Sequence, residues 1–192
     1  MTLQSEPTAC PWSIRIHQPC LCHSDRHALQ EIAVTQPDFR PIKRQLILNG
    51  GFVMLFGFAA GFAFVFFILG SIELWPIPGK IAYQLPGSDK AWRMTHLEGV
   101  INGLMLWLLA AVLPTFELSV KLTHRIAQAL IITAWAFPIA SLFDALFKDS
   151  RGLRFGGPIT NIIPFFLFYV GILTLIWAVV AVIVATWRQR PE

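Results

Sequence analysis

Charged side chains are scarce in this chain. Of its 192 residues only 14% are Asp, Glu, Lys or Arg, whereas 55% are hydrophobic and the mean hydropathy is +0.60. Ordinary soluble domains carry charge on about a quarter of their residues. The composition therefore excludes a soluble globular domain, a long disordered chain and a nucleic-acid-binding module. The net charge of +4 needs no acidic partner, because membrane proteins commonly place Lys and Arg beside their spans.

Cysteine is also scarce, and all three cysteines precede the first long apolar stretch. An odd number of cysteines in a polar segment is no disulfide framework. Histidines lie among them, but the spacing matches no zinc finger. Scattered side chains in a solvated tail are therefore favoured over a zinc site. The residues concerned are Cys10, His17, Cys20, Cys22, His23 and His27.

Residues 1–44 form a polar leader that contains five prolines and no helical stripe. We expect this leader to be disordered. It lacks the apolar core that a secretory signal places near the N-terminus. The transmembrane domain is expected over residues 45–190.

Four stretches of 18 residues or more are nearly or wholly free of charge, at 45–72, 99–116, 126–143 and 155–187. A helix needs about 20 apolar residues to cross a hydrocarbon core of roughly 30 Å. We therefore expect an all-α integral membrane protein, a bundle of four transmembrane helices at about 45–72, 95–114, 124–147 and 162–187. Four crossings place both termini on the same side. Gly57 and Gly61 form a small-xxx-small pattern that lets helices approach closely.

The orientation of these spans is only weakly encoded. Near the span ends, seven Lys and Arg residues lie on the side of the termini and six on the opposite side. A difference of one does not decide the positive-inside rule. Arg15 and Arg26 in the leader favour cytoplasmic termini, and we expect a bacterial cytoplasmic (inner) membrane.

His96 is the most informative polar residue at membrane depth, where such side chains are costly. At about 100° per residue, Gly99 and Gly103 share its helix face. One histidine above two glycines leaves a flat notch that suits a planar macrocycle, with the imidazole nitrogen on its iron. From the residues alone a simpler interpretation stays open. In it, His96 forms a hydrogen bond across a helix interface and the glycines allow close packing.

The other charged or titratable residues of the spans are expected to be structural. Glu98 can pair with Arg93 or accept bonds at the helix start, where the dipole favours an anion. Asp144 can reach water or meet Lys148. His124 is expected in the headgroup region.

Asn102 lies mid-helix, where an amide must find partners. It follows His96 by six residues, about 9 Å along the axis and about 120° around it. The same helix cannot place Asn102 on the far side of a ring that His96 holds. We therefore expect the site to lie between subunits of a homo-oligomer.

Residues 85–103, LPGSDKAWRMTHLEGVING, resemble the styrene oxide isomerase family, as does less specifically the loop RGLRFG at 151–156. By hydropathy and spacing the resemblance covers residues 49–184. It implies a small four-helix membrane enzyme that assembles as a homotrimer with haem b at the subunit interfaces. Such an enzyme opens a small apolar aryl epoxide and shifts a hydride to give an aldehyde, with no net redox change.

The resemblance also implies site residues. His96 would ligate the haem iron beside Gly99 and Gly103, and ferric iron would act as a Lewis acid on the epoxide oxygen. Asn102 would donate a hydrogen bond to that oxygen. Ser141 stands where the family carries a tyrosine. The serine hydroxyl is also a donor but is much shorter, so the substrate shape differs, a water fills the gap, or the activity is altered.

Two other functions remain open. One is a haem-binding membrane protein without isomerase activity, such as a sensor or an electron carrier. Bis-histidine electron transfer is disfavoured, because His124 is the only other histidine in the spans and is expected near the opposite membrane face. The other is a haem-free scaffold or small transporter, although the internal repeats and paired charges of transporters are missing.

Overall fold

The computed structural model describes residues 38–116, 118–150 and 152–189. They form four long α-helices, and each is long and apolar enough to cross a membrane. The expectation of an all-α chain with four transmembrane helices is confirmed. The predicted leader lies outside the described residues except for 38–44, of which 40–44 belong to the first helix. The helices are α2 (Arg40–Leu69), α3 (Asp89–Val112), α4 (Val120–Leu146) and α5 (Ile159–Arg188), and a short 3-10 turn, η1 (Leu113–Thr115), follows α3.

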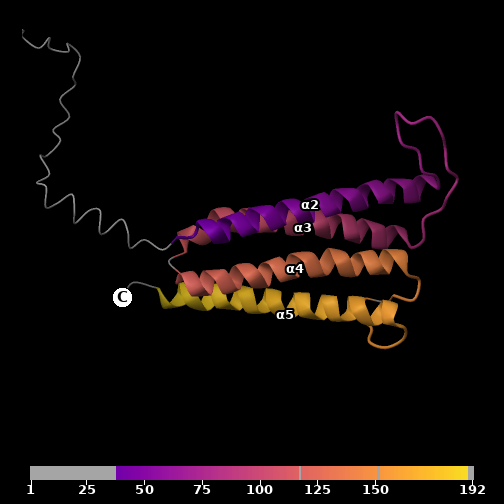
Figure 1. The fold of residues 1–192 in the computed structure, drawn as a ribbon. Helices are drawn as coiled ribbons and strands as arrows, with labels where there is room; N and C mark the ends of the chain where they lie inside the picture. Colours follow the sequence, from indigo (N-terminus) through magenta and orange to yellow (C-terminus); the bar gives the residue numbers. More distant parts are fainter. Residues whose placement is uncertain (1–37, 117, 151, 190–192) are drawn as a thin grey trace, which may run out of the picture. The chain divides into compact units, whose positions relative to one another are not determined.

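The four helices run side by side as two hairpins (Figure 1). Helix α2 packs along α3, α4 packs along α5, and α3 joins the two pairs through α4. Helix α4 also contacts α2, and 56% of its span is buried, against 11% for α5. Thus α4 forms the centre, while α5 turns most of its apolar surface outward, as a membrane helix does toward lipid. The start of α2 and the end of α5 lie at the same end of the bundle (Figure 1).

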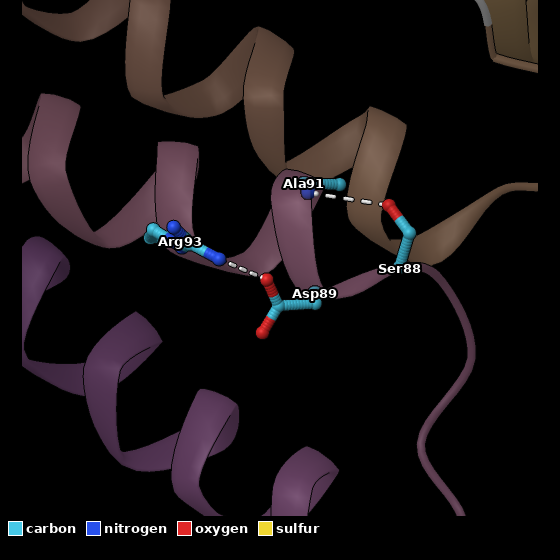
Figure 2. Close-up of polar contacts among 4 residues, drawn as sticks. All are labelled: Ser88, Asp89, Ala91 and Arg93. Atoms are coloured by element: carbon cyan, nitrogen blue, oxygen red, sulfur yellow. Dashed lines mark hydrogen bonds and ion pairs between the residues drawn. The ribbon is translucent and has the colours of Figure 1, made fainter.

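Helix α3 begins with a well-formed cap, shown in Figure 2. The Ser88 hydroxyl accepts a hydrogen bond from the Ala91 amide at 3.3 Å, which satisfies one of the unpaired donors of the first turn. Asp89 forms an ion pair with Arg93, one turn further on. Arg93 is therefore paired with Asp89, and the first of the two options considered for Glu98, an ion pair with Arg93, is not formed.

Glycine backbones meet along the seam between α2 and α3. A Cβ atom added to Gly99 would lie 2.4 Å from the Cα of Gly57. A Cβ atom added to Gly103 would lie 2.7 Å from the carbonyl oxygen of Gly50. Only residues without a side chain allow helix axes to come this close. The small-xxx-small pattern of the first span thus finds its partner in the second helix of the same chain.

Hydrogen bonds between helices tie α4 to its neighbours. The Trp135 indole donates to Asn49 Oδ1 on α2 at 3.1 Å. On the other side, Thr133 Oγ1 lies 2.9 Å from Thr174 Oγ1 and 3.1 Å from the Gly171 carbonyl of α5. Helix α4 continues through Pro138, which is buried.

The loops at the end opposite the start of α2 are held by polar side chains. Asp144 accepts hydrogen bonds from the Ser150 hydroxyl and, at 3.2 Å, from the Gly152 amide. It therefore serves the α4–α5 loop rather than Lys148. Asn161 is buried and donates to the carbonyls of Arg154 and Gly156 at 2.7 and 2.6 Å.

The segment between α2 and α3 turns back on itself, as its prolines and glycines predict. Ile72 and Ile81 form an antiparallel bridge. Beside it, the Lys80 ammonium lies 3.0 Å from the Glu73 carboxylate. The hydrogen bond and the charge of Lys80 hold the pKa of Glu73 below its ordinary value, and Ser71 adds a further hydrogen bond.

Gly57→Ala should destabilise the helix pair. The new Cβ would lie 2.7 Å from the Val100 nitrogen and 2.8 Å from the Gly99 carbonyl carbon, and backbone atoms cannot move aside as a side chain can. Overpacking of this kind costs about 1–3 kcal/mol. We expect a clearly lower melting temperature in detergent for this variant.

Gly51→Ala is the matched control, because its new Cβ would meet only Trp107 Cζ2 at 3.9 Å. It should melt close to the unaltered protein. Equal melting temperatures for the two variants would contradict the assigned α2–α3 contact.

Candidate functional site

The His96 ring is held by a backbone group of α2. Its Nδ1 atom lies 2.9 Å from the carbonyl oxygen of Gly57. A carbonyl oxygen only accepts, so Nδ1 carries the proton of this hydrogen bond, and in the neutral form of such a ring the lone pair lies on Nε2. Histidines that bind metals are oriented in this way, with the second ring nitrogen donating to a carbonyl or carboxylate.

The Nε2 atom of His96 has no hydrogen-bond partner among residues 38–116, 118–150 and 152–189. Over the same ranges, no fully buried side-chain nitrogen or oxygen lacks a partner. Nε2 is therefore not completely enclosed by the chain. The imidazole is half-buried, with one nitrogen anchored and the other available as a ligand.

Gly61 makes room for this imidazole. A Cβ atom at Gly61 would lie 2.7 Å from His96 Nδ1 and 3.0 Å from Cε1. Gly57 thus supplies the acceptor, and Gly61 supplies the space. Neither role was predicted from the sequence. The spacing of small residues in the first span was the available signal, since Gly57 and Gly61 match Gly99 and Gly103 on the facing helix.

The notch expected beside His96 is filled within the chain by α2. Gly99 and Gly103 are buried and contact the backbone of that helix. The structure therefore uses these glycines for close packing, as in the simpler of the two interpretations drawn from the sequence. Of the three residues expected to contact a ring, His96 is the one that presents an unpaired atom.

Asn102 lies on a different face of α3 and is 8% exposed. Its side-chain amide makes no hydrogen bond with any described residue. Because every completely enclosed polar side-chain atom of the described residues has a partner, this amide is not completely enclosed by the chain. An unpaired amide in the middle of a membrane helix calls for a partner, which a second subunit or a ligand can provide.

Ser141 and Glu98 are brought together across α3 and α4. The Ser141 hydroxyl, which is 3% exposed, donates to Glu98 Oε2 at 2.5 Å. The single proton of Ser141 is thus directed at Glu98. This pair was not predicted from the sequence. The contact depends on how two helices pack, and the spacing of residues within one helix does not determine it.

Ser141 also lines a cavity of about 280 Å³ at the loop end of α3, α4 and α5. This volume is close to the lower limit for small-molecule sites. The cavity has both polar and apolar walls. They are formed by Ser88, Lys90, Ala91, Met94, Ser141, Asp144, Ser150 and Phe168.

Asp144, which also lines this cavity, and His124 have further places in the fold. Asp144 holds the α4–α5 loop, and His124 lies in the first turns of α4. Within the part of the chain that the structure describes, no three His, Cys, Asp or Glu side chains come together as a metal-ion site.

Comparison with known proteins places the chain in a family. The family profile described as styrene oxide isomerase matches residues 42–187, which include all four helices almost completely. A styrene-oxide isomerase from Pseudomonas fluorescens is 33% identical over 90 residues, which are 46% of this chain and 52% of that protein. The match thus spans about half the length of this relative. The extent of the family match leads to one conclusion: the chain belongs to the styrene oxide isomerase family.

Proposed function

We propose that this chain is a membrane-bound, haem b-dependent epoxide isomerase, which converts a small apolar aryl epoxide to an aldehyde by a hydride shift. Family membership supports the reaction class, as does the activity named for the relative from Pseudomonas fluorescens. The observation that carries the haem assignment is the hydrogen bond from His96 Nδ1 to the Gly57 carbonyl. It orients the ring, and in the neutral ring it leaves the lone pair on Nε2.

The donor set fits a haem. One imidazole is sufficient as an axial ligand, and the Gly57 carbonyl fixes its tautomer and raises its basicity. When bound, the haem would supply a ferric iron that acts as a Lewis acid toward the epoxide oxygen. His96 would hold this group, and other side chains would contact the substrate.

Asn102 is suited to donate a hydrogen bond to the epoxide oxygen of the substrate. Its amide is unpaired within the described chain, so its N–H groups can donate to an oxygen on which charge develops. In the apolar interior of the membrane such a hydrogen bond is worth more than in water. No other side chain has to be displaced for this interaction.

The positions of His96 and Asn102 on one helix support a site shared between subunits. They are separated by about 9 Å along α3 and point about 120° apart, so they cannot face the same ring from opposite sides. A second copy of the chain would complete the site. We propose the homotrimer that the family resemblance implies.

The membrane can deliver the substrate and keep water away from the site. An apolar epoxide dissolves in the bilayer and reaches the spans from lipid, and a dry site prevents the attack of water that would give a diol. We propose the bacterial cytoplasmic membrane as the location.

The Ser141–Glu98 bond favours a second candidate function, a haem-binding membrane protein without isomerase activity. Ser141 stands at the position of the family tyrosine, and its proton is engaged with Glu98. Purified haem-loaded protein incubated with styrene oxide separates the two. Aldehyde formation above the rate without protein supports the isomerase, and an intact epoxide supports the alternative.

His96→Ala should abolish haem binding, because it removes the ligand nitrogen. Protein expressed with ample haem and purified in detergent should then show no Soret band. His124→Ala is the matched control and should keep the band at full intensity. A Soret band of normal intensity in His96→Ala would exclude His96 as the ligand.

Gly61→Ala should weaken haem binding while leaving the ligand in place. Its Cβ would lie 2.7 Å from His96 Nδ1 and push the ring away from the Gly57 carbonyl. Loss of such an outer hydrogen bond lowers the affinity for a metal about 10–100-fold. A haem titration monitored at the Soret band measures the change, with Gly51→Ala as control. Unchanged affinity would show that the carbonyl contact is irrelevant to binding.

Asn102→Ala should keep the haem but lose most of the turnover, because it removes the donor to the epoxide oxygen. Loss of one such donor lowers kcat about 10²–10³-fold. Aldehyde formation per haem is the measurement. Full activity in this variant would remove the role assigned to Asn102.

A further inference from the structure

The α2–α3 loop, residues 70–88, exposes large apolar side chains. Trp75 is 94% exposed, and four further apolar side chains of this loop are more than half exposed. The loop carries only two charged residues, Glu73 and Lys80, and these form an ion pair with each other. A group of exposed apolar side chains of this kind marks an interaction surface. The residues concerned are Leu74, Trp75, Ile77, Ile81 and Tyr83.

Hydrogen bonds give this loop a defined shape. The Ile72 amide donates to the Ile81 carbonyl at 2.9 Å, and the Ile81 amide donates back to the Ile72 carbonyl at 3.1 Å. The Gln84 side-chain amide donates to the Phe67 carbonyl at 3.0 Å, which fastens the loop to the last turn of α2. The apolar side chains are therefore presented by a folded segment that is tied to the end of a membrane-spanning helix.

The lengths of the helices place both ends of this loop in one headgroup layer. Helix α2 has 30 residues and is about 45 Å long, whereas the hydrocarbon core is about 30 Å thick. Lys43 and Arg44 hold the start of α2 in one headgroup layer, so its end at Leu69 reaches into the opposite one. The ion pair of Asp89 and Arg93 places the first turns of α3 in that same layer. The loop therefore begins and ends within a thin layer at the membrane surface.

The loop extends sideways from the bundle. Figure 1 shows it reaching away from the other helices past α2, rather than onward along the helix axes. When the helices cross a membrane, this direction is parallel to the bilayer surface and lies over the lipid beside α2. The last turn of α2 is itself apolar on its outer side, where Ile68 and Leu69 are more than half exposed. The apolar surface of the loop therefore continues the lipid-facing surface of α2.

We propose that the α2–α3 loop is a membrane-surface anchor, whose apolar side chains insert at the boundary between the lipid headgroups and the acyl chains, with Trp75 as the main contact. Trp and Tyr rings suit this depth because each combines an apolar body with one polar atom. The ion pair of Glu73 and Lys80 cancels the charge of the loop, so the anchor needs no anionic lipid. This inference rests on the transmembrane fold and does not depend on the proposed reaction.

The anchor would act on the helix pair that holds His96. Aromatic and basic groups at the membrane interface help to set the tilt and rotation of membrane helices. The loop connects α2 directly to α3, and the contact between these two helices brings the Gly57 carbonyl to His96. An anchored loop would therefore hold this pair at one depth and one rotation in the bilayer.

The depth of a spin label tests the anchor. A nitroxide is attached at Ile77→Cys in the full chain, with Cys10, Cys20 and Cys22 changed to Ser, and the protein is placed in phosphatidylcholine nanodiscs. We expect the label to collide often with oxygen, which dissolves in lipid, and rarely with a water-soluble nickel complex. Asp149→Cys is the matched control, because residue 149 is exposed in the α4–α5 loop at the same end of the bundle. Its label should meet the nickel complex severalfold more often.

Three results would overturn the proposal. A label at residue 77 that meets the nickel complex as often as one at residue 149 would show that the loop lies in water. A label shielded from both reagents would show that protein, such as a second copy of the chain, covers the loop in place of lipid. Protection that develops only after an anionic lipid is added would contradict an anchor that inserts through apolar side chains.

Trp75→Ser tests the main contact with the same label at Ile77→Cys. Because the Trp75 side chain is almost fully exposed, its loss should leave the fold intact. It should raise the nickel accessibility of the label severalfold, since the anchor loses its largest apolar side chain. Trp187→Ser, near the end of α5 at the opposite end of the bundle, is the control and should leave the accessibility unchanged. Equal accessibility in the two variants would contradict the role assigned to Trp75.

Discussion

The contact between the backbones of α2 and α3 determines the chemistry available to this protein. Glycines on both helices bring the axes so close that the Gly57 carbonyl reaches His96 Nδ1 at 2.9 Å. In a lipid environment, where apolar burial does not drive helix association, such packing and interhelical hydrogen bonding are the main sources of stability. The same contact fixes the imidazole. The glycines of this seam therefore both pack the two helices and position the histidine.

The polar side chains of the spans divide into two groups. Asn49, Thr133 and Thr174 are satisfied inside the chain and hold α4 against its neighbours. Three groups on α3 are different, since His96 Nε2, Glu98 Oε1 and the Asn102 amide form no hydrogen bond with the described residues. Polar groups left unpaired at membrane depth are costly, which makes them candidates for contacts with partners outside the chain. The haem, the substrate and the second subunit proposed above would provide such partners.

Much of the fold could be predicted from the sequence, because stretches without charge mark the spans directly. The start of α3 could not be predicted, and the observed helix begins six residues before the expected Thr95. The reason is that Asp89, Lys90 and Arg93 lower the hydropathy of this segment without breaking the helix. His96, Asn102 and Ser141 were found through their polarity and the family resemblance. Their partners Gly57 and Glu98 were missed, because a contact between two helices depends on their rotation and register, which the periodicity of one helix does not contain.

The central claim is that the two ring nitrogens of His96 have separate tasks, one on the Gly57 carbonyl and the other on the haem iron. A cryo-electron microscopy structure of the haem-loaded protein tests this claim most directly. We expect Nε2 to be bonded to the iron, with Nδ1 still within hydrogen-bond distance of the Gly57 carbonyl oxygen. A haem held by another side chain, or by Nδ1 with the Gly57 contact broken, would contradict it.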